Sequence, residues 1–342
     1  MSFVKNLWYV AAWSHEVGQQ PLGVCIADEP IVLYRRTDGS VVALEDRCPH
    51  RHAPLSLGRV EGDDIRCMYH GLRFGCDGVC REVPGNETIP PRAIARSFPV
   101  VERSSWIWAW TGDPAKADPA RVPTAFGLDN PEWVMRSGAL DYDADYQLLN
   151  DNLCDLSHLD FVHEATLGWS TGAKWSTEQP KIRALDDGLL FERWFLDHPQ
   201  APGRSERVDT WNSYRYLLPG VFLMTTQAYP VGTARECEFN EPTNNAKAVF
   251  RRVEQQAVTP ISEGRSRYLY ASGVEARIAT PQLLDGIFGV INASFAEDRR
   301  MIEAQQRVWN RTPADRKKAF IVQDKAPAMF RRLIEQRLAD ER

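Results

Sequence analysis

The sequence predicts an α+β protein of two domains, and three features of its pattern support this prediction. The first third alternates short runs of β-branched and aromatic residues with turn residues, as all-β domains do. From about Pro281 onward, apolar residues instead recur at helical spacing. The 342 residues exceed the size of a typical single domain. We therefore expect an all-β domain over residues 1–113 and an α+β domain over residues 114–342, in which helices flank a central antiparallel sheet.

The N-terminal domain can be followed strand by strand. The runs "IVLYRR" and "VVALED" are separated by the turn residues "TDGS", and "RFGCDGV" and "SSWIWAW" follow in the same style. The stretch "TGDPAKADPARVP" has no apolar periodicity and is rich in proline, which is typical of a linker or crossing segment. We place the domain boundary near Asp113.

The C-terminal domain begins with one predicted helical segment, from about Asp145 to Glu164. A β-rich middle follows, with strands in "YRYLLPGVFLMTTQAY" and "SRYLYASGVEA". Helices are predicted for the remainder of the chain. Strands followed by helices indicate a sheet with helices packed against it.

Composition excludes several classes of protein. The net charge of −5 and the lack of a basic patch give no reason to expect nucleic acid as a partner. No run of about 18 apolar residues could span a bilayer, and the N-terminus does not resemble a signal peptide, so we expect a cytoplasmic protein with no membrane partner. Most of the seven cysteines lie in the first third of the chain, which favours metal binding over a disulfide framework.

Two cysteine–histidine pairs indicate a metal site. Cys48 and His50 are two residues apart, and Cys67 and His70 are three apart. A structural zinc site could use these ligands, but zinc fingers usually place their two cysteines together and their two histidines together. A loop that supplies one cysteine and one histidine is instead typical of a Rieske [2Fe–2S] centre, in which two cysteines hold one iron and two histidines the other. Both interpretations remain open, with the Rieske centre favoured.

Other cysteines and histidines near these loops are not needed as ligands. His52 has no counterpart in the second loop, so we expect a loop or surface histidine. Cys76 and Cys80 have the spacing of a metal pair but no second pair beside them, and we expect free thiols.

A second candidate metal site lies in "YQLLNDNLCDLSHLDFVHEA", where His158 and His163 stand among leucines. Five residues apart, their side chains would point about 140° apart on a regular helix, so the helix must end or distort for both to bind one ion. A carboxylate would complete a two-histidine, one-carboxylate triad of the kind that binds iron(II) and leaves positions open.

Asp298 is the candidate carboxylate. It interrupts an apolar stripe that runs along one face of a predicted helix, as Ile291, Phe295 and Ile302 show. A carboxylate that faces a core must be paired or metal-bound. The alternative is a salt bridge to a buried arginine. The neighbours Glu297, Arg299 and Arg300 are expected on the solvent side.

With both motifs in place, the sequence resembles the terminal oxygenase component of Rieske non-haem iron oxygenases. The likeness covers essentially the whole chain and is strongest to the short enzymes of the vanillate O-demethylase, dicamba O-demethylase and toluenesulfonate methyl-monooxygenase type. It is carried by "NLWYVAAW", "ALEDRCPHRHAPLSLGRVEGDDIRCMYHGLRF", "IPPRAIARSFPVVER", "WIWAWTGDPAKADP" and "LLNDNLCDLSHLDFVH".

The resemblance implies ligand sets for two cofactors. The [2Fe–2S] Rieske cluster would be held by Cys48, His50, Cys67 and His70. The mononuclear non-haem iron(II), which uses O2 as co-substrate, would be held by His158, His163 and Asp298. Asp155 would bridge the two centres between neighbouring subunits of a head-to-tail homotrimer, and Asn152 would lie close to the iron without binding it. Electrons would come from an NAD(P)H-dependent reductase with flavin and [2Fe–2S] groups, directly or through a ferredoxin.

The implied reaction is hydroxylation of a methyl group on a small aromatic substrate. We expect oxidative O-demethylation of a methoxyarene, such as a vanillate-like aromatic acid, with release of formaldehyde. Alternatives are an aryl-methyl hydroxylase, a ring cis-dihydroxylating dioxygenase and, in a different class, a non-catalytic Rieske electron-transfer or ligand-binding protein.

The β-rich middle (residues 194–273) and the helix over residues 285–294 should line the pocket. Gln256 and Gly289 match substrate-contacting places in the dicamba-type enzymes; Gln256 is a candidate substrate residue, or else a solvent-facing strand residue.

Overall fold

The computed structural model describes residues 3–168, 174–200, 205–243, 245–313 and 315–342. The chain divides into two compact units. The first contains Met1–Gly127, Thr259–Glu263 and Arg337–Arg342, and the second contains Leu128–Val258 and Gly264–Gln336. The domain boundary between residues 113 and 114 stays a prediction. The first compact unit extends to Gly127 and also includes two later segments of the chain.

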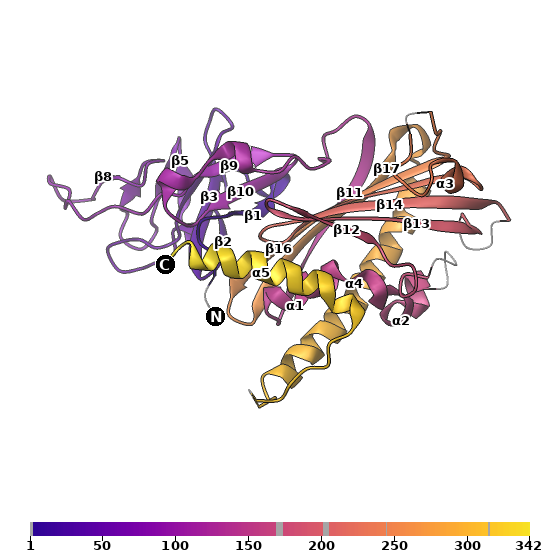
Figure 1. Cartoon of the computed structure of the whole chain (residues 1–342). Helices are drawn as coiled ribbons and strands as arrows, with labels where there is room; N and C mark the ends of the chain where they lie inside the picture. Colours follow the sequence, from indigo (N-terminus) through magenta and orange to yellow (C-terminus); the bar gives the residue numbers. More distant parts are fainter. Residues whose placement is uncertain (1–2, 169–173, 201–204, 244, 314) are drawn as a thin grey trace. The chain divides into compact units, whose positions relative to one another are not determined.

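The first unit is built from short antiparallel strands in three sheets (Figure 1), as predicted for the N-terminal domain. Tryptophans of β1 and β10 are almost completely buried, so these aromatic runs form a core. One sheet contains β1 (Trp8–Trp13), β10 (Trp106–Trp110) and β9 (Val100–Arg103); another contains β2 (Leu22–Ile26), β3 (Glu29–Arg35) and β4 (Val41–Glu45); the third contains β5 (Arg59–Glu61), β6 (Asp64–Arg66), β7 (Arg73–Phe74) and β8 (Cys80–Glu82).

The second unit contains a seven-stranded sheet, in the order β11, β17, β16, β15, β14, β13, β12. Side chains along each long central strand point alternately to the two faces of the sheet. One face can therefore line a cavity while the other packs against other parts of the unit. The strands are β11 (Trp133–Tyr142), β12 (Lys181–Leu185), β13 (Gly188–Pro199), β14 (Arg207–Leu217), β15 (Val221–Pro230), β16 (Phe250–Ser262) and β17 (Arg265–Glu275). The predicted central antiparallel sheet is therefore confirmed.

Helices α1 (Tyr146–Cys154), α2 (Leu159–Val162) and α4 (Pro281–Trp309) lie on the same side of this sheet (Figure 1). The helix α4 begins where Thr280 accepts a hydrogen bond from the main-chain N–H of Leu283 and Pro281 occupies the first turn. Its Phe295 packs edge to face on Tyr268 and Tyr270 of β17. The unit also contains α3 (Thr233–Glu236). The last helix in the sequence is α5 (Lys325–Ala339).

The predicted helical segment over residues 145–164 is not one helix. The α1 helix ends at Cys154, and Asp155 is extended, with φ −126° and ψ 99°. A 3₁₀ turn over Leu156–His158, the four-residue α2 and a π turn over Glu164–Gly168 follow. A local hydrogen bond explains why the helix is interrupted. The Asp155 carboxylate accepts a hydrogen bond from the main-chain N–H of Ser157, 2.9 Å away. Asp155 therefore caps a new turn instead of continuing α1.

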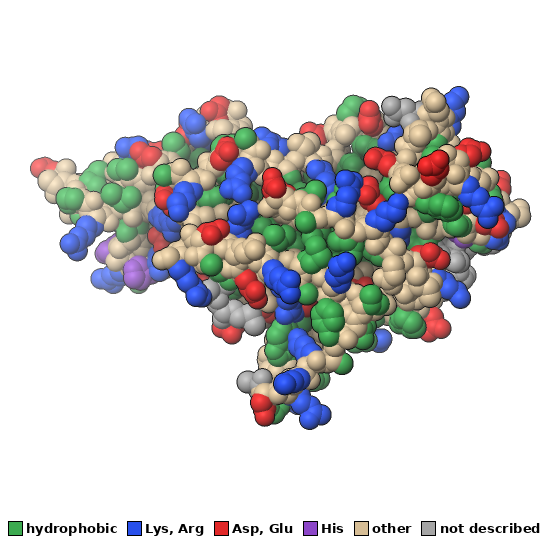
Figure 2. Space-filling model, in the orientation of Figure 1, with side chains coloured by type: hydrophobic (Ala, Val, Ile, Leu, Met, Phe, Trp, Pro, Cys, Tyr) green, Lys and Arg blue, Asp and Glu red, His purple; other side chains and the backbone are tan. Residues whose placement is uncertain are grey.

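The surface agrees with the charge pattern of the sequence. On the face shown in Figure 2, acidic and basic side chains are interspersed over both units. None of the helices within the described ranges is long and apolar enough to cross a bilayer.

Candidate metal centres

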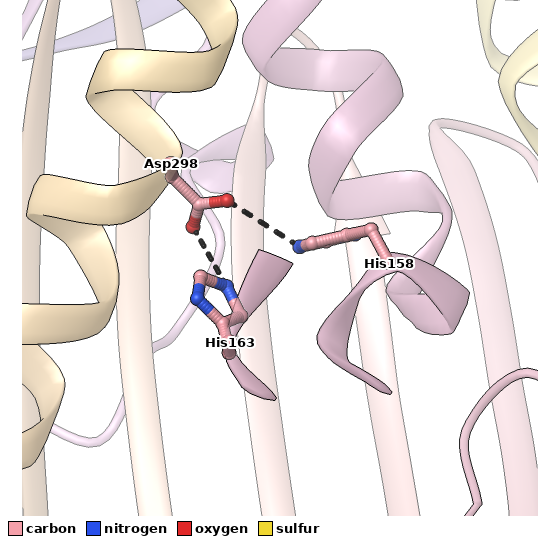
Figure 3. Close-up of side chains that lie close together, drawn as sticks. All are labelled: His158, His163 and Asp298. Carbon is pink, nitrogen blue, oxygen red and sulfur yellow. Dashed lines mark ion pairs between the residues drawn. The ribbon is translucent and has the colours of Figure 1, made fainter. Parts of the chain in front are cut away.

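Three side chains of the second unit converge on one point (Figure 3). His158 Nε2 lies 3.5 Å from Asp298 Oδ1, and His163 Nε2 lies 3.3 Å from Asp298 Oδ2. Potential ligand atoms of all three lie within 4.8 Å of one another. Within the part of the chain that the structure describes, no other group of three or more histidine, cysteine or carboxylate side chains is gathered so closely.

The broken helix is what brings the two imidazoles together. His158 ends the 3₁₀ turn, while His163 lies just past the end of α2 with φ −107° and ψ 26°. The predicted irregularity of this segment is therefore confirmed. Asp155 contributes its main-chain carbonyl oxygen, 2.6 Å from His158 Nδ1, so the carbonyl rather than the carboxylate orients this imidazole within one chain. The Nε2 atom is thereby directed to Asp298.

Asp298 is buried in α4, as its place in the apolar stripe predicted. The alternative of a salt bridge to a buried arginine is wrong, because its partners among the described residues are Asn152, His158 and His163. The Asn152 amide donates a hydrogen bond to Asp298 Oδ1 at 3.0 Å, and its Nδ2 lies 3.2 Å from His158 Nε2. Asn152 therefore holds the carboxylate against the histidines.

Glu297 was expected on the solvent side of α4, and this expectation is wrong. It is half-buried, and its Oε2 lies 2.9 Å from His163 Nδ1. Thr166 Oγ1 donates to the same oxygen at 2.8 Å, and Ser294 Oγ donates to Thr166 Oγ1 at 3.1 Å. The π turn over Glu164–Gly168 places Thr166 beside α4, and this contact draws the glutamate inward. Glu297 thus orients His163 as Asp155 orients His158.

The electrostatics of this group suit a cation. Burial lowers the pKa of His158, which favours the neutral imidazole that a metal requires. Burial also acts to lower the pKa of His163, but hydrogen bonds and charges of Asp298 and Glu297 outweigh it and raise that pKa. Two carboxylates around one buried imidazole leave negative charge that a bound cation would balance.

The spacing of the three donors fits a metal ion. A small divalent ion about 2.1 Å from each ligand, with right angles between them, places neighbouring ligand atoms about 3 Å apart. The two Nε2 atoms lie 3.5 and 3.3 Å from the Asp298 carboxylate, each facing a different oxygen, and potential ligand atoms of all three residues lie within 4.8 Å of one another. Both Nδ1 atoms have oxygen partners, as metal-bound imidazoles usually do. Two histidines and one carboxylate are the ligand types that bind mononuclear non-haem iron(II) in proteins.

A cavity of about 830 Å³ opens beside these residues. One wall comes from the apolar side chains of α4 and the other from one face of the sheet, as predicted from residues 194–273 and 285–294. Gln256 lies in the sheet wall and is buried, so its interpretation as a solvent-facing residue is wrong. Gly289, the other predicted match, is exposed on α4 and does not line the cavity. Residues that line the cavity include Asn152, His158, His163, Asp298, Met224, Ile287 and Phe295.

The two cysteine–histidine loops of the first unit have the same main-chain pattern. Cys48 follows β4, and its N–H donates to the carbonyl of Ala53 at 2.8 Å. Cys67 follows β6, and its N–H donates to the carbonyl of Leu72, also at 2.8 Å. In both loops the residue four positions after the cysteine has a positive φ, 58° at His52 and 80° at Gly71. Two equivalent loops thus present one cysteine and one histidine each.

The four side chains do not converge on one point, because the two cysteines are buried and the two histidines are exposed. Cys48 and Cys67 are buried, whereas His50 and His70 are exposed, with their ring centroids 4.5 Å apart. Figure 2 shows exposed histidine side chains at one edge of the first unit. A zinc site would draw all four side chains around one ion, but the described residues show no such convergence here. A buried cysteine pair and an exposed histidine pair suit a cluster of two irons.

The remaining predictions for this unit hold. His52 is exposed, and Cys76 and Cys80 are free thiols, the first exposed and the second buried.

Comparison with known proteins supports both sites. Residues 7–99 match the family described as "Rieske [2Fe-2S] domain", and residues 142–340 match "Vanillate O-demethylase oxygenase C-terminal domain". The chain belongs to the Rieske non-haem iron oxygenases. This Rieske oxygenase is 39% identical to the iron–sulfur subunit of the toluene-4-sulfonate monooxygenase system of Comamonas testosteroni, over 91% of this chain and 90% of that one. It is 35% identical to the oxygenase component of dicamba O-demethylase from Stenotrophomonas maltophilia, over 90% and 89%.

A solved crystal structure agrees with this family assignment. The crystal structure of dicamba monooxygenase with non-haem iron and dicamba is 31% identical, with a TM-score of 0.81 over 100% of this chain and 99% of that one. The Rieske oxygenase therefore carries a [2Fe–2S] cluster and a mononuclear non-haem iron, and it is an oxidoreductase. The relatives are named as oxygenase components, so the alternative of a non-catalytic electron carrier finds no support. The individual ligands of each cofactor stay predictions.

Proposed function

We propose that this Rieske oxygenase hydroxylates a methyl group of an aromatic acid, in the oxidative O-demethylation of a methoxyarene. The observation that carries the proposal is the triad of His158, His163 and Asp298 on the wall of a largely apolar cavity large enough for one substituted ring. Relatives named for dicamba and vanillate O-demethylation support the reaction type. One methoxyarene, one O2, two electrons and two protons would give one phenol, one formaldehyde and one water.

The residues take the following roles in the proposal. Cys48, His50, Cys67 and His70 hold the cluster, and His158, His163 and Asp298 hold the iron. When bound, the iron supplies the activation of O2 and the oxidation of the C–H bond, which side chains cannot perform. Asn152, Glu297 and the Asp155 carbonyl keep the three ligands in place. The apolar wall of α4 positions the ring and keeps water away from the methyl group.

Electrons reach the cluster from an NAD(P)H-dependent reductase with flavin and [2Fe–2S] groups, directly or through a ferredoxin. In a head-to-tail homotrimer, the Asp155 carboxylate would link the iron site of one subunit to His70 of the next. Asp155 is only partly buried within one chain. We place the enzyme in the cytoplasm, in the breakdown of aromatic compounds.

A second candidate reaction is hydroxylation of a methyl group attached directly to the ring. The 39% identity to the toluene-4-sulfonate monooxygenase subunit favours it. The same site could perform both reactions, because in each the oxidised bond is a methyl C–H.

The test is a product assay. Reconstituted protein, a reductase and O2 are incubated with methoxy- and methyl-substituted benzoates and benzenesulfonates, while formaldehyde, hydroxylated product and O2 uptake are recorded. The proposal predicts formaldehyde and phenol from a methoxyarene, in amounts that match the O2 consumed. A benzylic alcohol alone would support the second candidate. Only cis-diol products, or no substrate-dependent O2 uptake, would contradict both.

Replacing Glu297 with Gln should weaken iron binding at the mononuclear site. The substitution removes the charge that faces His163 Nδ1, and loss of such a partner typically lowers metal affinity about 10-fold. Iron affinity can be measured by competition with a chelator while cluster absorbance is monitored. Asp285→Asn is the matched control, since this aspartate is exposed on the same helix and pairs with Arg136 at the surface. Equal affinities in wild type and the Gln variant would refute the role of Glu297.

Replacing His50 with Cys should lower the reduction potential of the cluster. Thiolate in place of imidazole moves the centre toward all-cysteine clusters, whose potentials are near −400 mV. The wild-type protein should be red-brown and show a reduced-state electron paramagnetic resonance signal of low average g, which the variant alters. His52→Cys is the control, because this neighbouring histidine is outside the proposed ligand set. Stoichiometric zinc without labile sulfide in the purified wild type would contradict the assignment.

A further inference from the structure

The geometry points to Arg252 as the residue that binds the acidic group of the substrate, an aryl carboxylate or sulfonate. This inference rests on the proposed function and deepens it, since it names the side chain that would select aromatic acids over neutral arenes. Arg252 lies on β16 and lines the cavity that contains the iron triad. It is the one arginine or lysine among the described residues that line this cavity.

The side chain of Arg252 is 26% exposed, so part of it is open to the cavity that it lines. One of its Nη atoms donates to Glu254, also on β16. Its Nε, in contrast, is shielded from solvent and has no hydrogen-bond partner among the described residues. A buried N–H without an acceptor costs stability, so such a group usually awaits a ligand or a water. The planar fork of arginine suits a carboxylate or sulfonate, which can accept two parallel hydrogen bonds.

A chain of hydrogen bonds fixes the orientation of this guanidinium. The Tyr268 hydroxyl donates to Gln256 Oε1 at 2.6 Å, and Gln256 Nε2 donates to Glu254 Oε2 at 2.9 Å. The other oxygen of Glu254 accepts from Arg252. Tyr268, Gln256 and Glu254 are all buried. Gln256, predicted as a substrate residue, therefore acts in this proposal as a positioning residue that holds Glu254 and, through it, Arg252.

The same wall contains a second polar atom without a partner. In the sheet, Thr226 of β15 pairs with Arg252 on one side and with Asn212 of β14 on the other. Asn212 is buried, and its Nδ2 donates to Thr226 Oγ1 at 3.1 Å, but its Oδ1 has no hydrogen-bond partner in the described part of the chain. An amide acceptor and a guanidinium on the same wall, with one strand between them, suit a ring that carries an acidic group and a hydroxyl.

The experiment measures binding separately from turnover. Oxidised wild-type holoenzyme and two variants, Arg252→Gln and Arg251→Gln, are titrated calorimetrically with 4-methoxybenzoate, toluene-4-sulfonate and the neutral methyl 4-methoxybenzoate. Arg251 is the matched control: it is the adjacent residue of β16, does not line the cavity, and contacts Glu275 and Trp133 instead. Loss of a charge-assisted hydrogen bond should weaken binding of both acids about 10- to 100-fold in Arg252→Gln. Binding of the ester should change less than about 3-fold, and Arg251→Gln should match wild type.

If Arg252→Gln loses cluster or iron, Arg252→Lys provides the same test, because it keeps the charge and the aliphatic stem but lacks the Nε–H donor. It should weaken binding of the acids about 10-fold. Wild-type affinity for the acids in either folded variant, or a wild type with no preference for the acids over the ester, would overturn the inference. Acids that bind through Arg252 without being oxidised would contradict the proposed function alone. Oxidation of the acids unchanged in Arg252→Gln would contradict the role of Arg252 alone.

Discussion

Replacing Asp298 with Ala should abolish turnover and leave the [2Fe–2S] cluster intact. The substitution removes the carboxylate that faces both His158 and His163, so two imidazoles remain to hold the iron. Loss of a residue that only orients a ligand typically costs 10- to 100-fold. Loss of the ligand itself should therefore lower kcat more than about 100-fold, with mononuclear iron missing from the protein. The cluster belongs to the first unit and should keep its full absorbance.

Asp285→Ala serves as the control for this experiment. It removes an aspartate from the same helix, but one that is exposed and pairs with Arg136 at the surface, so its effect on stability should be within about 0.5 kcal/mol. Iron and sulfide content, visible absorbance and product formation are measured for all three proteins. Full activity in Asp298→Ala, or loss of the cluster together with the iron, would show that Asp298 is not the ligand assigned here.

Replacing Asp155 with Asn should slow electron transfer to the iron at least about 10-fold while both metals remain bound. Within one chain, Asn can reproduce what Asp155 does. Its side-chain oxygen can still cap the N–H of Ser157, and its main-chain carbonyl still faces His158 Nδ1. What the substitution removes is the negative charge that would face the neighbouring subunit in the proposed trimer.

Stopped-flow measurement of cluster oxidation, in a single turnover with substrate present, reports the transfer rate directly. Thermal denaturation provides the control, because a residue that only caps a turn should give similar stability as Asp or Asn and the same transfer rate. Cluster oxidation at the wild-type rate in Asp155→Asn would exclude the bridge. A sedimentation measurement on the same sample shows whether the protein is the trimer that the bridge requires.

Much of the metal chemistry was predictable because its ligands follow local rules. The paired cysteine and histidine of each loop stand close together in the sequence, so their spacing indicated a metal site and favoured a Rieske cluster over zinc. Asp298 could be found because a carboxylate in an apolar helical stripe is unusual. The irregularity of the segment that contains His158 and His163 followed from the angle that a regular helix would impose.

Other contacts could not be predicted because they depend on packing between distant segments. Glu297 lies about 100° around the helix from Asp298, which indicated solvent, yet the π turn places Thr166 where it pulls the glutamate toward His163. Arg251 and Arg252 are adjacent, and alternation along a strand shows only that they face opposite ways. The face of the sheet on which α4 packs decides that Arg252 faces the cavity.

A single-turnover reaction tests the central claim, that one chain supplies both the electron store and the iron site for oxidation of a methyl group. Wild-type protein is chemically reduced, freed of excess reductant, and mixed with O2 and a methoxybenzoate in the absence of reductase. We expect cluster oxidation and formation of phenol and formaldehyde to occur together, with yield proportional to mononuclear iron. Cluster oxidation without product at full iron content, or equal product from the Asp298→Ala protein, would contradict this claim.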